Sequence, residues 1–230
     1  MSSPKASGVA AIAFSAAALV LSTIAVALPR WASSATYTDG LGALCLTTES
    51  HRCLQYHTTN HGQPLSTSLC DAPAALPAWE ELAAHMQLTP TQLSDHVNAM
   101  CSLRGNGMIV MVALTMFTGF VSLVVLSNGV CFGRLKNSTV PLAVVCNAVA
   151  FLAALISISI YSKPAGASYD VSWYLLLVAA FLYVVSLMFA IVYRTKRRTD
   201  EDAHPHTPFD DVLEVGRVRI ETPTVTAAPA

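Results

Sequence analysis

The chain has 230 residues, of which 53% are hydrophobic and only 12% are charged, about half the charged share of an average soluble domain. Its formal net charge is -1, which argues against nucleic acid as a partner. The apolar residues are concentrated in four blocks, at 8–28, 107–127, 140–161 and 173–193. Each block has the ~20 residues that cross a bilayer core of ~30 Å, so the sequence predicts an integral membrane protein embedded in membrane lipid.

The first block follows a short N-terminal segment, residues 1–7, which we expect in the cytoplasm. A cleaved signal peptide is the alternative to a membrane span here, because Ala25-Val26-Ala27 resembles a cleavage site. The apolar stretch is longer than the ~7–15 residues of a signal peptide's hydrophobic region, so we expect a span at 8–28. Small residues recur four apart in it, as in Ala11 and Ser15, and allow close packing within the bundle or in a homo-oligomer.

Residues 29–106 form a long loop that holds four of the six cysteines: Cys45, Cys53, Cys70 and Cys101. An even number of cysteines on one side suits an oxidising compartment, so we expect two disulfides in an extracellular domain. Four cysteines allow three pairings, and we favour Cys45–Cys53 with Cys70–Cys101. Local sequence supports the first pair, because residues 44–48 and 53–57 have the composition of two short strands joined by a turn at 49–52.

The second half of this loop has a helical pattern. Apolar residues recur at helical spacing from Trp79 to Met86 and again from Leu93 to Met100. Between them, Thr89-Pro90-Thr91-Gln92 has the form of a capping box with proline at the first helical position. We therefore expect strands within about 31–57 and helices within about 78–103.

Lysine and arginine are distributed unevenly around the four blocks. Most of them flank the N-terminus, the turn at 128–139 and the tail at 194–230, whereas the long loop and the short loop at 162–172 have few near their ends. The positive-inside rule therefore places both termini in the cytoplasm and both loops outside. The tail is rich in proline, threonine and acidic residues, and we expect it to be disordered.

Cys131 lies at the cytoplasmic end of the second block, close to Arg134 and Lys136. A juxtamembrane cysteine of this kind is a candidate for palmitoylation, and a plain thiol is the alternative. The sequon at Asn137 falls in the same cytoplasmic turn, so we expect it to stay unglycosylated.

The four blocks contain no Asp, Glu, Lys, Arg or His. Membrane enzymes and ion-coupled transporters keep such residues at membrane depth, so we expect no catalytic residue, no cofactor and no enzyme activity. Asn147 is the most polar side chain in the blocks, and we expect it to hydrogen bond to a neighbouring helix. His51, His57 and His61 lie close together in the long loop, but that stretch has strand and loop character, so their spacing predicts no metal site.

Residues around the first block and before the second form a motif: Pro29, Trp31, Gly40, Leu41, Cys45, Cys53 and Arg104. The motif resembles that of the claudin superfamily, which includes claudins, peripheral-myelin and epithelial-membrane proteins, and calcium-channel gamma subunits. The resemblance implies an all-α transmembrane four-helix bundle that carries a small five-stranded extracellular β-sheet, to which the helical pattern adds a loop helix. It also implies that Trp31 anchors the loop at the membrane and that Cys45 and Cys53 staple two adjacent strands. Arg104 either packs against the loop, as in the family, or simply ends the second span.

Two features depart from the family motif. Gly42 stands where the motif has a second tryptophan, and Cys45 and Cys53 are eight positions apart, closer than is usual in claudins. The segment Cys45-Leu46-Thr47, with Cys101 before the second block, also looks like the amastins, four-span surface proteins of trypanosomatid parasites. The amastin motif continues with Leu-Trp-Gly, which residues 48–50 do not supply. The branch of the superfamily therefore stays open.

The sequence thus predicts a non-enzymatic four-span surface protein of the plasma membrane whose first loop contacts a protein partner, with a homo-oligomer as one arrangement. Two functions fit this description. One is cell adhesion, barrier formation or membrane organisation through the disulfide-stapled loop. The other is an auxiliary subunit that modulates a channel or receptor. A membrane enzyme or transporter is the third and least supported alternative.

Overall fold

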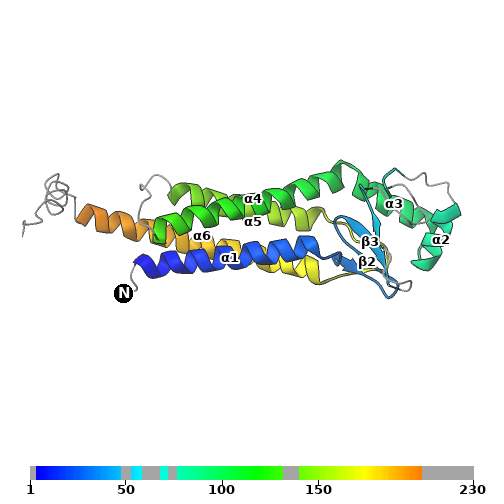
Figure 1. Ribbon diagram of the computed structural model, residues 1–230, viewed down its shortest axis with the longest axis horizontal. Coiled ribbons are helices and arrows are strands. Elements are labelled where there is room, and N and C mark those ends of the chain that lie inside the picture. The colour runs from blue at the N-terminus through cyan, green and yellow to red at the C-terminus, as the bar shows by residue number, and fades with distance from the viewer. Residues whose placement is uncertain (1–3, 48–52, 59–67, 72–76, 132–139, 204–230) are drawn as a thin grey trace, which may run out of the picture.

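The computed structural model describes residues 4–47, 53–58, 68–71, 77–131 and 140–203. Four long helices lie side by side, and a small sheet with two short helices is attached at one end of them (Figure 1). The long helices are α1 (Pro4–Ala27), α4 (Leu103–Cys131), α5 (Val140–Ile160) and α6 (Val171–Ala203). Each contains a segment long and apolar enough to cross a membrane. This agrees with the four spans that the sequence predicts and indicates an integral membrane protein.

The bundle is closed by small residues on its inner side. Helix α1 packs against α4 and α6, and α5 packs against the same two helices. On α1, Ala11, Ala18 and Ala25 have no exposed surface, which lets the neighbouring backbones approach closely. Ala13 and Ala17 are exposed instead. The small-residue pairs of the first span therefore divide between the bundle interior and its outer surface.

Polar side chains inside the bundle link one helix to the next. The amide nitrogen of Asn147 on α5 donates to the Ser186 hydroxyl of α6 at 3.2 Å, and that hydroxyl donates to the Ala11 carbonyl of α1 at 2.9 Å. All three residues are fully buried. The predicted interhelical hydrogen bond of Asn147 is therefore confirmed, and it extends over three helices.

Helix α6 is longer than the sequence predicts. The apolar block was expected to end at 193 and a disordered tail to begin at 194, but the helix continues to Ala203. No proline or glycine interrupts the chain before Pro205, and the Thr195 and Thr199 hydroxyls donate to carbonyls four residues earlier in the same helix. Residues 194–203 are therefore helical, and the rest of the predicted tail lies outside the described residues.

The sheet has five strands in the order β4-β3-β2-β1-β5, and every neighbouring pair is antiparallel. The strands are β1 (Ala32–Ser33), β2 (Tyr37–Asp39), β3 (Ala43–Leu46), β4 (Cys53–Gln55) and β5 (Ser168–Tyr169). Strand β4 lies within the predicted segment 53–57, whereas β3 begins one residue before the predicted segment 44–48 and ends at Leu46. Strand β5 comes from the short loop between the third and fourth spans, where the sequence gives no strand signal. The sheet thus joins both loops at this end of the bundle.

Two short helices complete this end, α2 (Pro77–His85) and α3 (Pro90–Cys101). The predicted capping box is confirmed at the start of α3, where the Gln92 amide donates to the Thr89 hydroxyl at 3.2 Å and the Thr89 amide donates to the Gln92 side chain at 3.0 Å. The helix ends at Cys101, because the backbone at Ser102 is extended. We call the strands, α2, α3 and their connections, at 29–47, 53–58, 68–71, 77–102 and 161–170, the sheet domain.

Gly119 of α4 is a position where even a methyl group has no room. A Cβ atom placed there would overlap the hydroxyl of Tyr183, whose side chain is fully buried in the bundle. We expect Gly119→Ala to lower the thermal unfolding midpoint in detergent, because overpacking of this kind costs about 1–3 kcal/mol. Gly107→Ala in the same helix is the control, since nothing lies within 4 Å of its added Cβ. Equal midpoints for the two variants would contradict this packing.

Candidate functional site in the sheet domain

One buried carboxylate lies at the centre of the sheet domain. Asp39, the last residue of β2, has no exposed surface. Its Oδ1 accepts a hydrogen bond from the Tyr56 hydroxyl at 2.6 Å, and its Oδ2 accepts one from the Tyr161 hydroxyl at 2.7 Å. Nε2 of His96 lies 3.2 Å from the same Oδ2 and 3.3 Å from the Tyr56 oxygen. We call these four residues the Asp39 hub.

The hub supplies hydrogen-bond donors to the Asp39 carboxylate, a group that is costly to bury. A carboxylate removed from water is stable only when charges or donors surround it. Burial, followed by the neighbouring Asp39 carboxylate, raises the pKa of Tyr56 well above its usual value and raises the pKa of Tyr161 for the same two reasons. The same causes raise the pKa of Tyr37 to about 12. The hydroxyls around Asp39 therefore stay protonated at neutral pH and remain donors.

Trp31 joins the sheet to the end of α1. Its indole nitrogen donates to the Ala25 carbonyl at 2.9 Å, and its amide donates to the Asp39 carbonyl at 2.7 Å. The residue four after Ala25 is Pro29, which has no N–H to give, so the indole supplies the donor that the helix end lacks. The Trp31 ring is fully buried, 5.3 Å from the ring of Tyr161. This accounts physically for the Pro-x-Trp order in the sequence.

The turn between β2 and β3 lies close against the same junction. A Cβ atom at Gly40 would overlap the backbone of Pro29, so only glycine allows this approach. Leu41 is buried, whereas an added Cβ at Gly42 would find its nearest atom 4.0 Å away. Beside Gly42 lies an apolar pocket of about 280 Å³. It is lined by Val26, Leu41, Gly42, Ile109, Val112, Ala113 and Met116. None of these side chains is acidic or basic.

Both favoured disulfides are present. Cys45 and Cys53 are opposite one another in the β3–β4 pair, with Cα atoms 3.9 Å apart. The second bridge joins Cys70 to Cys101 at the end of α3, with Cα atoms 5.5 Å apart. The predicted turn at 49–52 lies outside the described residues. The two bridges therefore fix different parts of the sheet domain, one within the sheet and one between a loop and α3.

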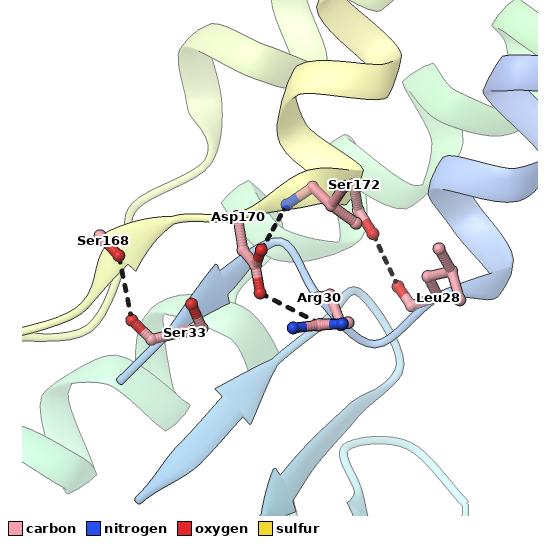
Figure 2. Close-up of polar contacts among 7 residues, drawn as sticks. Leu28, Arg30, Ser33, Ser168, Asp170 and Ser172 are labelled. Carbon is pink, nitrogen blue, oxygen red and sulfur yellow. Dashed lines mark hydrogen bonds and ion pairs between the residues drawn. The ribbon is translucent and has the colours of Figure 1, made fainter. Parts of the chain in front are cut away.

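The junctions α1–β1 and β5–α6 are held together by a second set of contacts (Figure 2). Arg30 Nε lies 3.2 Å from Oδ2 of Asp170, and Oδ1 of Asp170 accepts from the Val171 amide at 2.7 Å at the start of α6. The Ser172 hydroxyl donates to the Leu28 carbonyl at 3.2 Å. The Arg30 side chain is 55% exposed, and exposed pairs of this kind contribute at most about 1 kcal/mol. The hydrogen bonds at the backbone and at the helix ends therefore contribute more to the alignment of the two junctions than the ion pair does.

Arg104, in the first turn of α4, reaches the end of α5. Its Nε donates to the Ile160 carbonyl at 2.9 Å, the last residue of that helix. A cation at a helix C-terminus also interacts favourably with the helix dipole. The contact is to the end of a neighbouring span and not to the first loop, so it does not decide between the two sequence interpretations of Arg104.

The comparisons with known proteins add no further assignment. No protein-family model and no curated protein matches the chain. Function is therefore inferred from the geometry of the sheet domain.

The remaining predicted sites are separate from the hub. Among the residues that the structure describes, no group of three or more His, Cys, Asp or Glu side chains could hold a metal ion. His57 lies beside Cys70, while His51 and His61 lie outside the described residues. Cys131 is a free and exposed thiol at the end of α4, and its palmitoylation stays a prediction.

The contacts of the Asp39 hub were not predicted from the sequence. Its members come from β2, from the segment after β4, from α3 and from the residue that follows α5, and the pairs are 17 to 122 positions apart. No local motif links them. The only signal in the sequence is Asp39 itself, a single acidic residue among uncharged neighbours in a strand. Both carboxylate oxygens of Asp39 are occupied by side chains of the protein itself, so the hub holds the elements that carry these side chains in position.

Removal of the central carboxylate tests this role. Asp39→Ala leaves the buried groups of Tyr56, Tyr161 and His96 without their acceptor, and we expect the free energy of unfolding to fall by about 2–5 kcal/mol. Thermal unfolding of the purified protein in detergent measures this loss. Tyr56→Phe should cost less, and Tyr174→Phe is the control because its side chain is exposed. Stability of Asp39→Ala within the error of wild type would show that the hub is dispensable.

Proposed function

We propose that this chain is a claudin-like, non-enzymatic four-span protein of the cell surface, which acts in adhesion, barrier formation or membrane organisation through its sheet domain. The motif residues support the resemblance, because Pro29, Trp31 and Gly40 lie together at the α1–β1 junction and Leu41 is buried in the same core cluster as Trp31. Each of them has a structural task there, which a coincidental motif would not require. Function then depends on what the sheet domain presents to a partner.

An outer location of the sheet domain is supported by charge and by cysteine chemistry. The lysine and arginine residues favour cytoplasmic termini, which supports a sheet domain on the outer side of the membrane. Its two disulfides suit an oxidising exterior. The free cysteines among the described residues, Cys131 and Cys146, are on α4 and α5. The disulfides thus lie in the sheet domain and the free thiols lie on the spans, as the proposed orientation requires.

The observation that carries the proposal is the edge of the sheet at β5. This strand is the last in the sheet, and both of its side chains are exposed. The Tyr169 ring stacks on Trp173 with centroids 4.6 Å apart, and Trp173 meets Tyr174 at 5.1 Å. Tyrosine and tryptophan are the residues that protein interfaces favour, and an unpaired edge offers main-chain donors and acceptors to a partner. We call Ser168, Tyr169, Trp173 and Tyr174 the edge surface.

Rigidity makes the edge surface suitable for contact with another protein. The Asp170 amide donates to the Trp31 carbonyl at 3.0 Å, and the Ser172 amide donates to the Arg30 carbonyl at 2.9 Å. These main-chain bonds hold β5 and the start of α6 on the α1–β1 junction, next to the side-chain contacts drawn in Figure 2. A preorganised surface loses little conformational entropy on binding. Trp173 and Tyr174 are in the first turn of the fourth candidate span, so the proposed partner contacts the edge surface where it meets the membrane; it is a protein in the same or an opposing membrane, including a second copy of this chain.

A second function, an auxiliary subunit of a channel or receptor, is favoured by the apolar pocket beside Gly42. The pocket opens between α1 and α4, two of the candidate spans, and its lining is aliphatic apart from one methionine. A side chain from a helix of a larger membrane protein would fit such a surface. Copurification with one larger protein at fixed stoichiometry would favour this function over adhesion.

The proposed orientation can be tested with Cys131. This thiol is exposed at the end of α4 opposite the sheet domain. We expect a membrane-impermeant maleimide to label it only after the cells are permeabilised, because the proposal places it in the cytoplasm. Cys131→Ser should abolish that label. Labelling of Cys131 in intact cells would reverse the orientation and remove the basis for an outer sheet domain.

The contact role can be tested by expression in cells that do not normally adhere. We expect the wild-type protein to concentrate at cell contacts, and we expect Tyr169→Ser with Tyr174→Ser to lower that enrichment by roughly fivefold or more, since interface aromatics often contribute 1–2 kcal/mol each. Leu103→Ser is the matched control, because Leu103 is an exposed apolar residue on a different element. Enrichment that is equal in all three proteins would exclude the edge surface as the contact.

A further inference from the structure

The two disulfides of the sheet domain differ in their surroundings. The Cys45–Cys53 bridge joins opposite residues of two paired strands, and Cys45 is only 7% exposed. The Cys70–Cys101 bridge joins the segment 68–71 to the last residue of α3. Both of its cysteines are partly buried at the margin of the core. The second bridge is therefore the one whose two ends lie outside regular strand pairing.

An imidazole lies against this second bridge. Nδ1 of His57 is 3.6 Å from Sγ of Cys70, and the histidine is exposed. Main-chain bonds fix the arrangement, since the Cys70 amide donates to the Tyr56 carbonyl and the Leu69 amide donates to the Gln55 carbonyl, each at 3.0 Å. The backbone pairing of these two segments thus brings His57 beside Cys70.

A histidine in this position affects the chemistry of the bridge. Thiol–disulfide exchange is faster when the departing sulfur is a better leaving group, and a neighbouring imidazolium stabilises a thiolate. His57 touches Cys70 rather than Cys101, so it favours departure of Cys70 and attack at Cys101.

We propose that the Cys70–Cys101 bridge is a site of thiol–disulfide exchange, at which a thiolate from outside attacks Cys101 and His57 assists the departure of Cys70. The attacking thiolate forms a new S–S bond to the Cys101 sulfur as the old bond breaks. The electron pair of the old bond leaves on the Cys70 sulfur, which receives a proton from the His57 imidazolium. A second thiolate then attacks the sulfur of the first thiol in this mixed disulfide, the bond to Cys101 breaks, and the Cys101 sulfur leaves as a thiolate that takes a proton from water. Two thiols are oxidised to one disulfide, and the bridge is reduced to two thiols.

Reduction of this bridge releases a defined part of the sheet domain. The end of α3 loses its covalent link to the segment 68–71, while His96, one and a half turns earlier in α3, still contacts Asp39. Freedom is therefore gained at the α3–α4 junction, next to the exposed Leu103, and the Asp39 hub holds the remainder. The inference requires that the sheet domain faces a compartment containing thiols, but it does not depend on the proposed adhesive contact.

The experiment uses the purified full-length protein in detergent, with Cys131 and Cys146 blocked by alkylation beforehand. The protein is incubated with increasing concentrations of reduced glutathione, the newly freed thiols are alkylated, and each cysteine is quantified by peptide mass spectrometry. We expect Cys70 and Cys101 to be freed at glutathione concentrations that leave Cys45 and Cys53 bridged. We also expect the intermediate mixed disulfide to carry glutathione on Cys101.

His57→Gln tests the role of the imidazole. We expect this variant to open the Cys70–Cys101 bridge roughly five- to tenfold more slowly than wild type, whereas His85→Gln, at another histidine of the sheet domain, should leave the rate unchanged. Three results would overturn the proposal: equal or earlier reduction of Cys45–Cys53, glutathione attached to Cys70, or an unchanged rate in His57→Gln. The first two are measured on the wild-type protein, so they remain decisive even if the variant fails to fold. None of the three depends on cell contact.

Discussion

The sheet domain depends on the burial of one carboxylate. Asp39 has no exposed surface, and a charge in that position is stable only if its oxygens are fully occupied. Two hydroxyls and an imidazole occupy them, and these groups come from a loop, from α3 and from the end of α5. Each donor is correctly placed only when its own element is correctly placed. A single requirement for satisfied hydrogen bonds therefore sets the positions of the sheet, the loop helix and the bundle relative to one another.

Hydrogen bonds also satisfy the unpaired backbone groups at the helix ends that meet the sheet domain. A helix that ends at the membrane surface leaves backbone groups unpaired. The last turn of α1 is completed by the Trp31 indole, the end of α5 by Arg104, and the start of α6 by the Asp170 carboxylate. In each case the donor or acceptor belongs to the sheet domain or to the first turn of a neighbouring span. The spans and the sheet domain are thus joined through groups that would otherwise be unsatisfied, which makes the connection stiff.

Local signals in the sequence predicted a large part of this structure. Block length was enough for the four spans, the Thr89 capping box was enough for the start of α3, and the distribution of cysteines pointed to both bridges. Three features required knowledge of the fold. Strand β5 has only two residues and exists because β1 is beside it. The Asp39 hub combines residues that no motif links, and α6 extends past its apolar block because nothing in the next ten residues stops a helix. The interactions that form β5 and the hub are nonlocal. The extension of α6 depends on helix continuation, which a hydropathy pattern does not report.

The two disulfides contribute to the sheet domain in unequal ways, because only one of them duplicates an existing constraint. Cys45 and Cys53 are already opposite each other in a hydrogen-bonded strand pair, so their bridge reinforces a register that the backbone also specifies. The Cys70–Cys101 bridge links a loop to a helix that contacts the remainder of the sheet domain through His96. Because that hub contact is independent of the bridge, α3 has a covalent and a polar attachment in addition to its buried apolar side chains, Leu93, Val97 and Met100. Loss of the covalent attachment would therefore loosen the α3–α4 junction without separating the sheet from the spans, and the edge surface on the opposite end of the strand order would keep its geometry.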